Sequence, residues 1–226
     1  ICVIGIGGVG SWVVEALARS GIGELTLIDM DDICVTNINR QLPAMSGTIG
    51  KLKTEVMSER VKLINPECTV NIIDDFISPE NQSDYLNRGY DYVIDAIANV
   101  KTTASLIAYC KRNKINVITI GGAGGQTDPT QIQIADLSKT IQDPLLAKVR
   151  SVLRKDYNFS QNPKRKFSID AIFSTQPLIF PQMTEDCSIS ATMNCANGFG
   201  AATMITANFG FFAVSRVIDK LLKKKS

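Results

Sequence analysis

Short apolar runs alternate with stretches of helical periodicity along the first half of the chain. Residues 1–6 form a continuous apolar run that ends in a glycine-rich turn, and residues 12–18 then place apolar side chains at helical spacing. Residues 24–28 form a second apolar run, and residues 51–64 resemble an amphipathic helix that ends at Asn65-Pro66. This order predicts strand, helix, strand and helix in succession.

The same alternation continues as far as Gly121. Further short strands are expected at residues 69–73, 92–94 and 116–120, with helices at 79–87 and 101–113. Strands that alternate with helices form a parallel sheet covered on both faces. The sequence therefore predicts an α/β fold with a doubly wound, mainly parallel, Rossmann-like sheet.

After Gly121 the pattern changes to an appended α+β region. A polar strand is expected at residues 131–134, a helix at 144–155, a mobile loop at 158–166 and an irregular polar segment at 182–197. A final helix ends in Lys223, Lys224 and Lys225. Its apolar run at residues 199–215 is too short and too polar for a bilayer span, so we expect a core or interface helix and no membrane contact.

Composition adds few constraints. The 226 residues are 45% hydrophobic, and the net charge of +2 is too small to require a nucleic-acid partner. The six cysteines include no CxxC pair, which favours reduced thiols in a cytoplasmic protein over a zinc site. There is no secretory signal, and the chain opens on a strand without an initiator Met, so a further N-terminal segment is expected.

The turn after the first predicted strand reads Gly5-Ile6-Gly7-Gly8-Val9-Gly10. Glycines at the start of a helix let a phosphate approach bare backbone at the positive end of the helix dipole. Asp29 ends the second predicted strand, where an acid can accept hydrogen bonds from a ribose diol. These features alone indicate a nucleotide or dinucleotide, and a merely tight turn is the alternative.

Two cations follow Asp29 and point to a triphosphate. Arg40 offers a rigid fork of donors and Lys53 a mobile point charge, which suits phosphate oxygens held from two directions. An NAD(P)-linked oxidoreductase would leave both without a role. The plain alternative is that both are solvated surface charges.

At this point the sequence resembles a known family. The string from Gly5 to Ser11, Asp29, the Asn37-x-x-Arg40-Gln41 motif and Lys53 are similar to the adenylation core of the ubiquitin-activating-like enzymes, over essentially the whole chain. Three separated stretches, residues 28–32, 121–132 and 198–204, are most similar to the branch that acts on threonylcarbamoyladenosine in tRNA.

The resemblance implies a single adenylation domain over residues 1–226, with a nucleotide-binding half at 1–125 and a substrate and dimerisation half at 126–226. It implies ATP and Mg²⁺ as cofactors, adenylation of the threonylcarbamoyl carboxylate, and ring closure by the neighbouring ureido group. A tRNA bearing threonylcarbamoyladenosine would be the substrate, and the chain would form a homodimer.

The resemblance also implies roles for individual residues. Arg40, Lys53 and Asp95 would be catalytic, and Asp95 would be the metal ligand. The nucleotide would be held by the glycine turn, by two acids and by the motif residues: Gly7, Gly8, Asp29, Asp31, Asn37, Arg40, Gln41 and Lys53.

One position departs from the family pattern. The family reads Asp-Ala-Ile-Asp after the fourth strand, whereas this chain reads Asp95-Ala96-Ile97-Ala98. Alanine cannot ligate a metal. Ala98 is either a natural variant that depends on Asp95 or an alteration that disables the enzyme, and we expect weakened catalysis with a retained fold.

Other candidate features leave alternatives open. A stretch of seven cations (Lys148, Arg150, Arg154, Lys155, Lys164, Arg165 and Lys166) with Tyr157, Phe159 and Phe167 interleaved is either a tRNA contact or a solvated face. Cys187 and Cys195 lie where related activators can carry a reactive thiol. Two further functions remain open: adenylation of a ubiquitin-like or sulfur-carrier protein, and a nucleotide-dependent interaction module that binds a partner in a sulfur-transfer relay.

Overall fold

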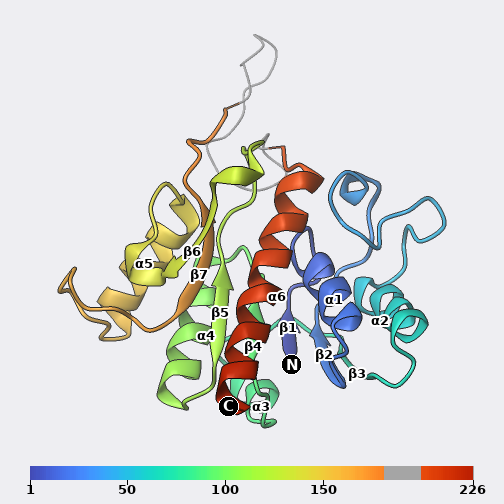
Figure 1. Ribbon diagram of the computed structural model, residues 1–226, viewed down its shortest axis with the longest axis horizontal. Coiled ribbons are helices and arrows are strands. Elements are labelled where there is room, and N and C mark those ends of the chain that lie inside the picture. Colours follow the sequence, from blue (N-terminus) through green and yellow to red (C-terminus); the bar gives the residue numbers. More distant parts are fainter. Residues whose placement is uncertain (181–199, 226) are drawn as a thin grey trace.

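Seven strands form one sheet in the part of the chain that the computed structural model describes, residues 1–180 and 200–225 (Figure 1). Their order is β3-β2-β1-β4-β5-β7-β6, and every neighbouring pair is parallel except β6 and β7. The bounds are β1 Cys2–Ile4, β2 Glu24–Ile28, β3 Thr69–Ile73, β4 Val93–Asp95, β5 Val117–Ile120, β6 Ile132–Asp136 and β7 Asp170–Ser174. The predicted α/β, doubly wound sheet is confirmed.

Helices cover both faces of the sheet (Figure 1). The first core contains side chains of α1 (Gly10–Arg19), α2 (Lys53–Ile64) and α6 (Thr203–Lys225), and the second those of α3 (Gln82–Leu86), α4 (Val100–Arg112) and α5 (Pro144–Asp156). Strand residues alternate between the cores, so Val3 faces the first while Cys2 and Ile4 face the second. Three short 3₁₀ helices complete the elements: η1 Val35–Asn37, η2 Pro129–Gln131 and η3 Leu137–Lys139.

The sheet reverses its winding between β1 and β4. The chain runs outward from β1 through β2 to β3, and then crosses back to place β4 on the other side of β1. The connections that leave the carboxyl ends of β1 and β4 therefore diverge to opposite faces, and such a switch point opens a crevice where nucleotides bind in doubly wound folds. The glycine turn lies at this point.

Helix α6 packs on α1 within the same chain. A Cβ added to Gly210 would lie 3.1 Å from Trp12 Cβ, Val13 N and Val9 O, so any larger residue would require α1 or α6 to shift by a few tenths of an ångström. The Trp12 and Phe211 rings meet edge to face with centroids 6.0 Å apart. Part of the surface of α6, which we expected to be a core or interface helix, is thus used inside the monomer, and the homodimer stays a prediction.

Two sequence expectations are corrected by the fold. The first strand ends at Ile4 instead of residue 6, because Gly5 adopts a φ of +86° that leaves the extended conformation. Strand β7 was not predicted, because only five residues carry it and Asp170 and Ser174 interrupt its apolar character. In the part of the chain that is described, no helix has the length and apolar content needed to cross a membrane.

Candidate active site

The glycines of the turn have different structural roles. A Cβ on Gly5 would lie 2.9 Å from Ala96 O, and one on Gly10 would lie 1.7 Å from Gly5 O, so these two glycines are required to build the turn. A Cβ on Gly7 would meet only Gln41 Nε2, at 3.9 Å. The turn itself therefore leaves room beside Gly7, and its backbone is accessible to a ligand.

The N-terminus of α1 begins at this turn without a side-chain cap. Val9 occupies the N-cap position, and its apolar side chain cannot accept a hydrogen bond from the first N–H groups of the helix. In contrast, Asn99 caps α4 by accepting from the N–H groups of Lys101 and Thr102. An uncapped helix N-terminus beside bare glycine backbone provides N–H donors and a positive dipole end for an anion.

Asp29 connects the end of β2 to the glycine turn. Its Oδ2 accepts a 2.6 Å hydrogen bond from Ile6 N, and its Oδ1 accepts one of 2.8 Å from Asp31 N. The side chain is buried. A carboxylate has about four lone-pair sites, so the two backbone bonds leave acceptor capacity for a ribose hydroxyl.

Arg40 is placed directly against the turn. A Cβ on Gly8 would lie 3.4 Å from Arg40 Cγ and Cδ. The carbonyl of Arg40 accepts hydrogen bonds from Trp12 Nε1 at 3.1 Å and Thr206 Oγ1 at 3.4 Å, which fixes its backbone between α1 and α6. The guanidinium donates to Thr36 O at 2.8 Å through Nη1. The structure therefore brings this predicted cation to the glycine turn.

Lys53 is held by an acid of the same site. Its Nζ lies 2.7 Å from Asp31 Oδ2, and its side chain is 6% exposed while that of Asp31 is 52% exposed. Asp31 N in turn donates to Asp29, so hydrogen bonds and an ion pair run from the turn through Asp29 and Asp31 to Lys53. The ion pair with Asp31 thus holds Lys53 beside the site, and the Lys53 side chain does not extend into bulk solvent.

The two amides of the motif behave differently. Asn37 Oδ1 accepts from Cys34 N at 3.0 Å and closes the short η1 helix. Gln41 is buried, and its Oε1 has no hydrogen-bond partner among the residues that the structure describes. A buried acceptor without a partner costs about 1–3 kcal/mol, a cost that a donor at this position would offset.

Asp95 is fully buried at the end of β4. Its Oδ1 accepts from Ile97 N at 3.1 Å and its Oδ2 accepts from Thr119 Oγ1 at 2.8 Å. Burial raises the pKa of Asp95 to about 6. Ala98 is exposed, between β4 and the N-cap of α4. Within residues 1–180 and 200–225, no cluster of three or more His, Cys, Asp or Glu side chains could hold a metal.

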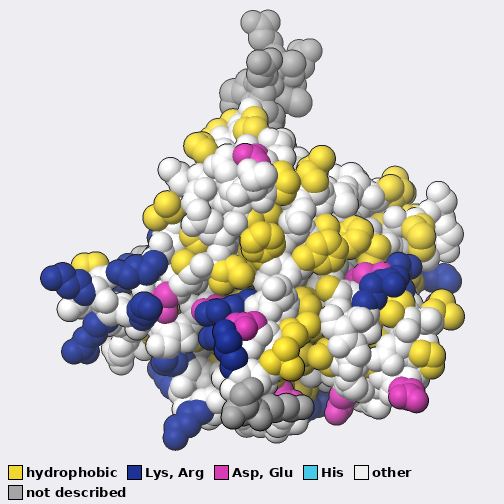
Figure 2. All heavy atoms as spheres, viewed as in Figure 1, with side chains coloured by type: hydrophobic (Ala, Val, Ile, Leu, Met, Phe, Trp, Pro, Cys, Tyr) yellow, Lys and Arg dark blue, Asp and Glu magenta, His cyan; other side chains and the backbone are white. Residues whose placement is uncertain are grey.

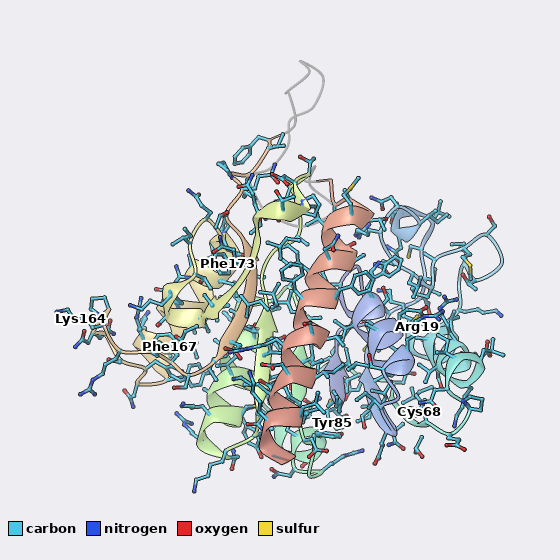
Figure 3. All side chains as sticks on the ribbon, in the orientation of Figure 1. Arg19, Cys68, Tyr85, Lys164, Phe167 and Phe173 are labelled. Carbon is cyan, nitrogen blue, oxygen red and sulfur yellow. The ribbon has the colours of Figure 1, made fainter. Side chains whose placement is uncertain are left out.

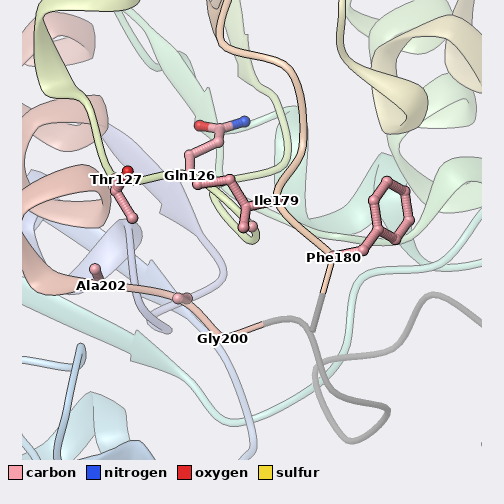
Figure 4. Close-up of a pocket in the computed structure, with 8 residues that line it drawn as sticks. Gln126, Thr127, Ile179, Phe180, Gly200 and Ala202 are labelled. Carbon is pink, nitrogen blue, oxygen red and sulfur yellow. The ribbon is translucent and has the colours of Figure 1, made fainter. Parts of the chain in front are cut away.

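A cavity of about 390 Å³ lies where residues 125–127 approach residues 200–202, and Ala201 in its lining contacts the segment that carries Arg40 (Figure 4). Asn39 Nδ2 donates to Ala201 O at 2.7 Å and joins the two regions. The lining includes Gln126, Thr127, Ile179, Phe180, Gly200 and Ala202. These residues are uncharged, so the cavity suits an uncharged portion of a substrate better than phosphates.

The sequence matches the ThiF family over residues 1–225. The chain belongs to the ThiF family. It is 97% identical over 226 residues to the tRNA threonylcarbamoyladenosine dehydratase of Haemophilus influenzae (strain ATCC 51907 / DSM 11121 / KW20 / Rd), covering 100% of this chain and 87% of that protein. It is 57% identical over 231 residues to the dehydratase of that name from Escherichia coli (strain K12), covering 99% and 86%.

A solved structure extends the similarity to three dimensions. The E. coli tRNA N6-threonylcarbamoyladenosine dehydratase TcdA, crystallised in complex with ATP, superimposes with a TM-score of 0.90 at 55% identity, covering 99% of this chain and 86% of that one. The ThiF-family chain described here therefore shares its fold with an ATP-bound relative.

Ser11, Trp12 and Thr206 support the site in this ThiF-family chain, but no role was predicted for them. Ser11 Oγ accepts from Leu42 N at 3.2 Å, so together with the Trp12 and Thr206 bonds it docks the segment around Arg40 on the turn. Ser11 directly follows the last glycine of the motif, and this position was the only signal. Thr206 is 166 residues from Arg40, and no local pattern could connect them.

The cysteines add no described site. Cys187 and Cys195 lie outside the described residues. Of the four described cysteines, none forms a disulfide, and only Cys34 is exposed. Burial raises the pKa of both Cys2 and Cys110 to about 12, which keeps these thiols protonated and unreactive.

Proposed function

We propose that this protein catalyses the ATP-dependent dehydration of threonylcarbamoyladenosine in tRNA, through adenylation of its carboxylate. The observation that carries the proposal is the packing of Arg40 on Gly8 at the uncapped start of α1, beside the buried, unpartnered Gln41 oxygen. A bare turn, a cation and an acceptor without a partner together suit a nucleotide better than a simple anion. Membership of the ThiF family and the ATP-bound relative support the same reaction.

Each site residue has a role in this proposal. The backbone of Gly7 and Gly8 lies against the phosphates, and Asp29, with Asp31 beside it, accepts from the ribose. Arg40 and Lys53 neutralise the polyphosphate and stabilise charge that develops at the α-phosphorus. Asn37 and Gln41 complete the polar contacts, with Gln41 Oε1 accepting the donor it lacks.

The chemistry follows from the poor reactivity of a carboxylate. A carboxylate oxygen attacks the α-phosphorus of ATP, pyrophosphate leaves, and a mixed anhydride forms. The ureido group of the same substrate then attacks the acyl carbon, loses a proton and expels AMP, which closes the ring. The substrate loses the elements of water, while ATP becomes AMP and pyrophosphate. The protein contributes mainly positioning and charge stabilisation.

Mg²⁺ remains part of the proposal as the companion of ATP. The residues present fit a dedicated metal site poorly, because both Asp95 oxygens already accept hydrogen bonds and Ala98 offers no ligand. Protein Mg²⁺ sites often use only one or two carboxylates plus substrate phosphates. We propose that alanine at position 98 lowers the rate of the reaction.

Two other functions are tested in the same assay. Purified protein is mixed with ATP and either tRNA bearing threonylcarbamoyladenosine or a sulfur-carrier protein, and AMP, pyrophosphate and the mass of the modified nucleoside are measured. AMP release with tRNA and a nucleoside lighter by one water supports the dehydratase. AMP release with the carrier alone indicates a carrier-activating enzyme, and ATP binding without any product indicates an interaction module in a sulfur relay.

The assembly and location remain proposals. A homodimer is proposed from the exposed positions of α6, including Met204 and Phe211, and is tested by the molar mass in solution. A cytoplasmic location agrees with a tRNA substrate and with the absence of disulfides among the four described cysteines.

A further inference from the structure

Positive charge is concentrated in one segment of the chain. Residues 139–168 contain eight Lys or Arg and two Asp, a formal charge of +6, whereas the whole chain has +2 and the remaining residues therefore carry −4. Figure 2 shows Lys and Arg side chains gathered where Figure 1 places α5 and the loop that follows it. We call α5 and residues 157–168 the basic face. Such clustering on a net acidic remainder indicates a polyanionic partner.

The loop of the basic face follows a fixed path. Lys139 Nζ donates to Pro163 O at 2.6 Å, and Asp136 accepts from Phe167 N at 2.9 Å and Ser168 N at 2.7 Å. We expected this loop to be mobile, but these bonds attach it to the region around β6. Figure 3 places Lys164 at the outer end of the loop and Phe167 nearer the sheet. The exposed cations of the loop are thus presented from an anchored support.

Among the residues that the structure describes, the cations of this face form no ion pair with a carboxylate. The described ion pairs use Glu15, Asp31, Asp170 and Asp219, all outside the segment. Five of the cations are exposed: Lys148, Lys155, Lys164, Arg165 and Lys166. Burial and the neighbouring charge of Arg154 lower the pKa of Arg150, and the carboxylate of Asp143 offsets part of this shift. A bound anion would relieve the repulsion between Arg150 and Arg154.

The aromatic rings of the segment are used within the fold. Phe167 is 3% exposed, it meets Phe159 with centroids 4.9 Å apart, and the Arg154 guanidinium lies 5.4 Å from its ring centroid. The guanidinium of Arg112, at the end of α4, lies 5.8 Å from the centroid of Tyr157. If the stretch contacts tRNA, exposed rings in it could stack on bases. Their packing favours contact with phosphates instead of bases.

An RNA backbone fits this surface better than a protein does. Among the described large apolar side chains that are exposed, only Ile141 lies within residues 139–168. Stable protein interfaces are built around an apolar core, which this face lacks. RNA supplies a repeating row of negative charges, and α5, with 13 residues, extends over about 20 Å, enough to follow several phosphates.

We propose that the basic face binds the sugar-phosphate backbone of the substrate RNA at a distance from the nucleotide to be modified. This assignment rests on the proposed function for the identity of the RNA. The face contributes affinity without reading sequence, while the site at the glycine turn performs the chemistry. The contact is electrostatic and therefore weakens steeply as salt is added.

The test compares two triple variants with the same change in net charge. The first is Lys164→Gln/Arg165→Gln/Lys166→Gln, and the control is Lys62→Gln/Arg88→Gln/Lys223→Gln, at exposed positions outside the basic face. Binding of fluorescently labelled tRNA bearing threonylcarbamoyladenosine is measured by anisotropy at several salt concentrations. Thermal unfolding verifies that each variant is folded, and Lys148→Gln/Lys155→Gln on α5 provides an independent second variant.

We expect the first triple to bind about 10–100-fold more weakly and to lower the slope of log K against log[salt] by about 2–3. The KM for tRNA should rise, while kcat at saturating tRNA and the KM for ATP stay unchanged. The control should bind like the wild type. An unrelated RNA duplex should displace labelled tRNA from the basic face of the wild-type protein. It should have less effect on the first triple variant, which has lost this contact.

The outcomes separate this proposal from the proposed function. Equal tRNA affinity and equal salt dependence in the two triple variants would refute RNA binding by the basic face, even when the enzyme is active. If the wild-type protein binds tRNA through this face but does not dehydrate it, the proposed reaction is refuted while RNA binding by the basic face is supported. Wild-type protein that neither binds nor converts tRNA overturns both, and an acidic protein or a membrane then becomes the partner to seek.

Discussion

The glycine turn makes a prediction in which folding and binding respond in opposite ways. In Gly7→Ala, the added Cβ has Gln41 Nε2 as its nearest non-neighbouring atom, at 3.9 Å, and Gly7 is not among the positive-φ glycines. The folded state can therefore accept the methyl group. Because alanine restricts the unfolded chain more than glycine does, the free energy of unfolding should stay equal or rise by up to about 1 kcal/mol.

ATP binding by the same variant should fall. The methyl group would occupy the space beside the turn where the phosphates approach the backbone. Loss of one hydrogen bond to a charged group costs about 1.5–3 kcal/mol, which corresponds to roughly 10–150-fold weaker binding. Gly10→Ala provides the contrast, because its Cβ would lie 1.7 Å from Gly5 O and the turn would have to open. Its free energy of unfolding should fall by more than about 3 kcal/mol.

The two quantities are measured separately. Urea denaturation gives the free energy of unfolding of each variant, and isothermal titration calorimetry gives its affinity for ATP. Gly23→Ala is the matched control, since a Cβ there meets nothing within 4 Å and Gly23 follows α1 at the end away from the turn. Wild-type ATP affinity in a folded Gly7→Ala protein would refute the placement of phosphates against this backbone.

Three further substitutions test the rest of the site. Asp95→Asn should flatten the pH dependence of the free energy of unfolding. In the folded protein the pKa of Asp95 is raised to about 6, so its protonated form stabilises the fold fully below about pH 3.8, and this stabilisation is lost as the pH rises through 6. The free energy of unfolding should change by up to about 3 kcal/mol across this window. Urea denaturation across that window measures it, and an unchanged slope contradicts the raised pKa. Lys53→Met should lower the rate of AMP release about 100–1,000-fold. It should change the free energy of unfolding by no more than about 1 kcal/mol, because Asp31 stays 52% exposed and hydrated; an unaffected rate in a folded variant would remove Lys53 from the reaction. Ala98→Asp should raise the rate of AMP release at saturating Mg²⁺, and an equal rate in the two proteins would count against a missing ligand.

Local patterns were sufficient for the first half of the fold. Apolar runs followed by helical spacing marked β1, α1, β2 and α2, because the strands are buried on both faces and the helices bury one side. Strand β7 was missed, because a five-residue run with polar ends carries no distinctive period. Its position between β5 and β6 depends on pairing with strands distant in the sequence.

For the candidate site, the sequence named residues but could not give their arrangement. Motif spacing identified Gly8, Arg40 and Lys53 as a group, and the structure brings Arg40 to Gly8. Spacing could not show that Lys53 would pair with Asp31, or that both oxygens of Asp95 would accept hydrogen bonds inside the fold. Such details depend on side chains from separate elements that compete for the same partners.

The sequence by itself determined the alternation of strands and helices, the glycine turn and the set of charged residues near it, because these are properties of neighbouring positions. The tertiary structure alone decided which of those residues meet. Thr206 reaches Arg40 across 166 positions only after α6 has packed on α1, and the basic face exists only because Asp136 and Lys139 attach the loop after α5. Long-range packing fixes these contacts, and no short-range periodicity records them.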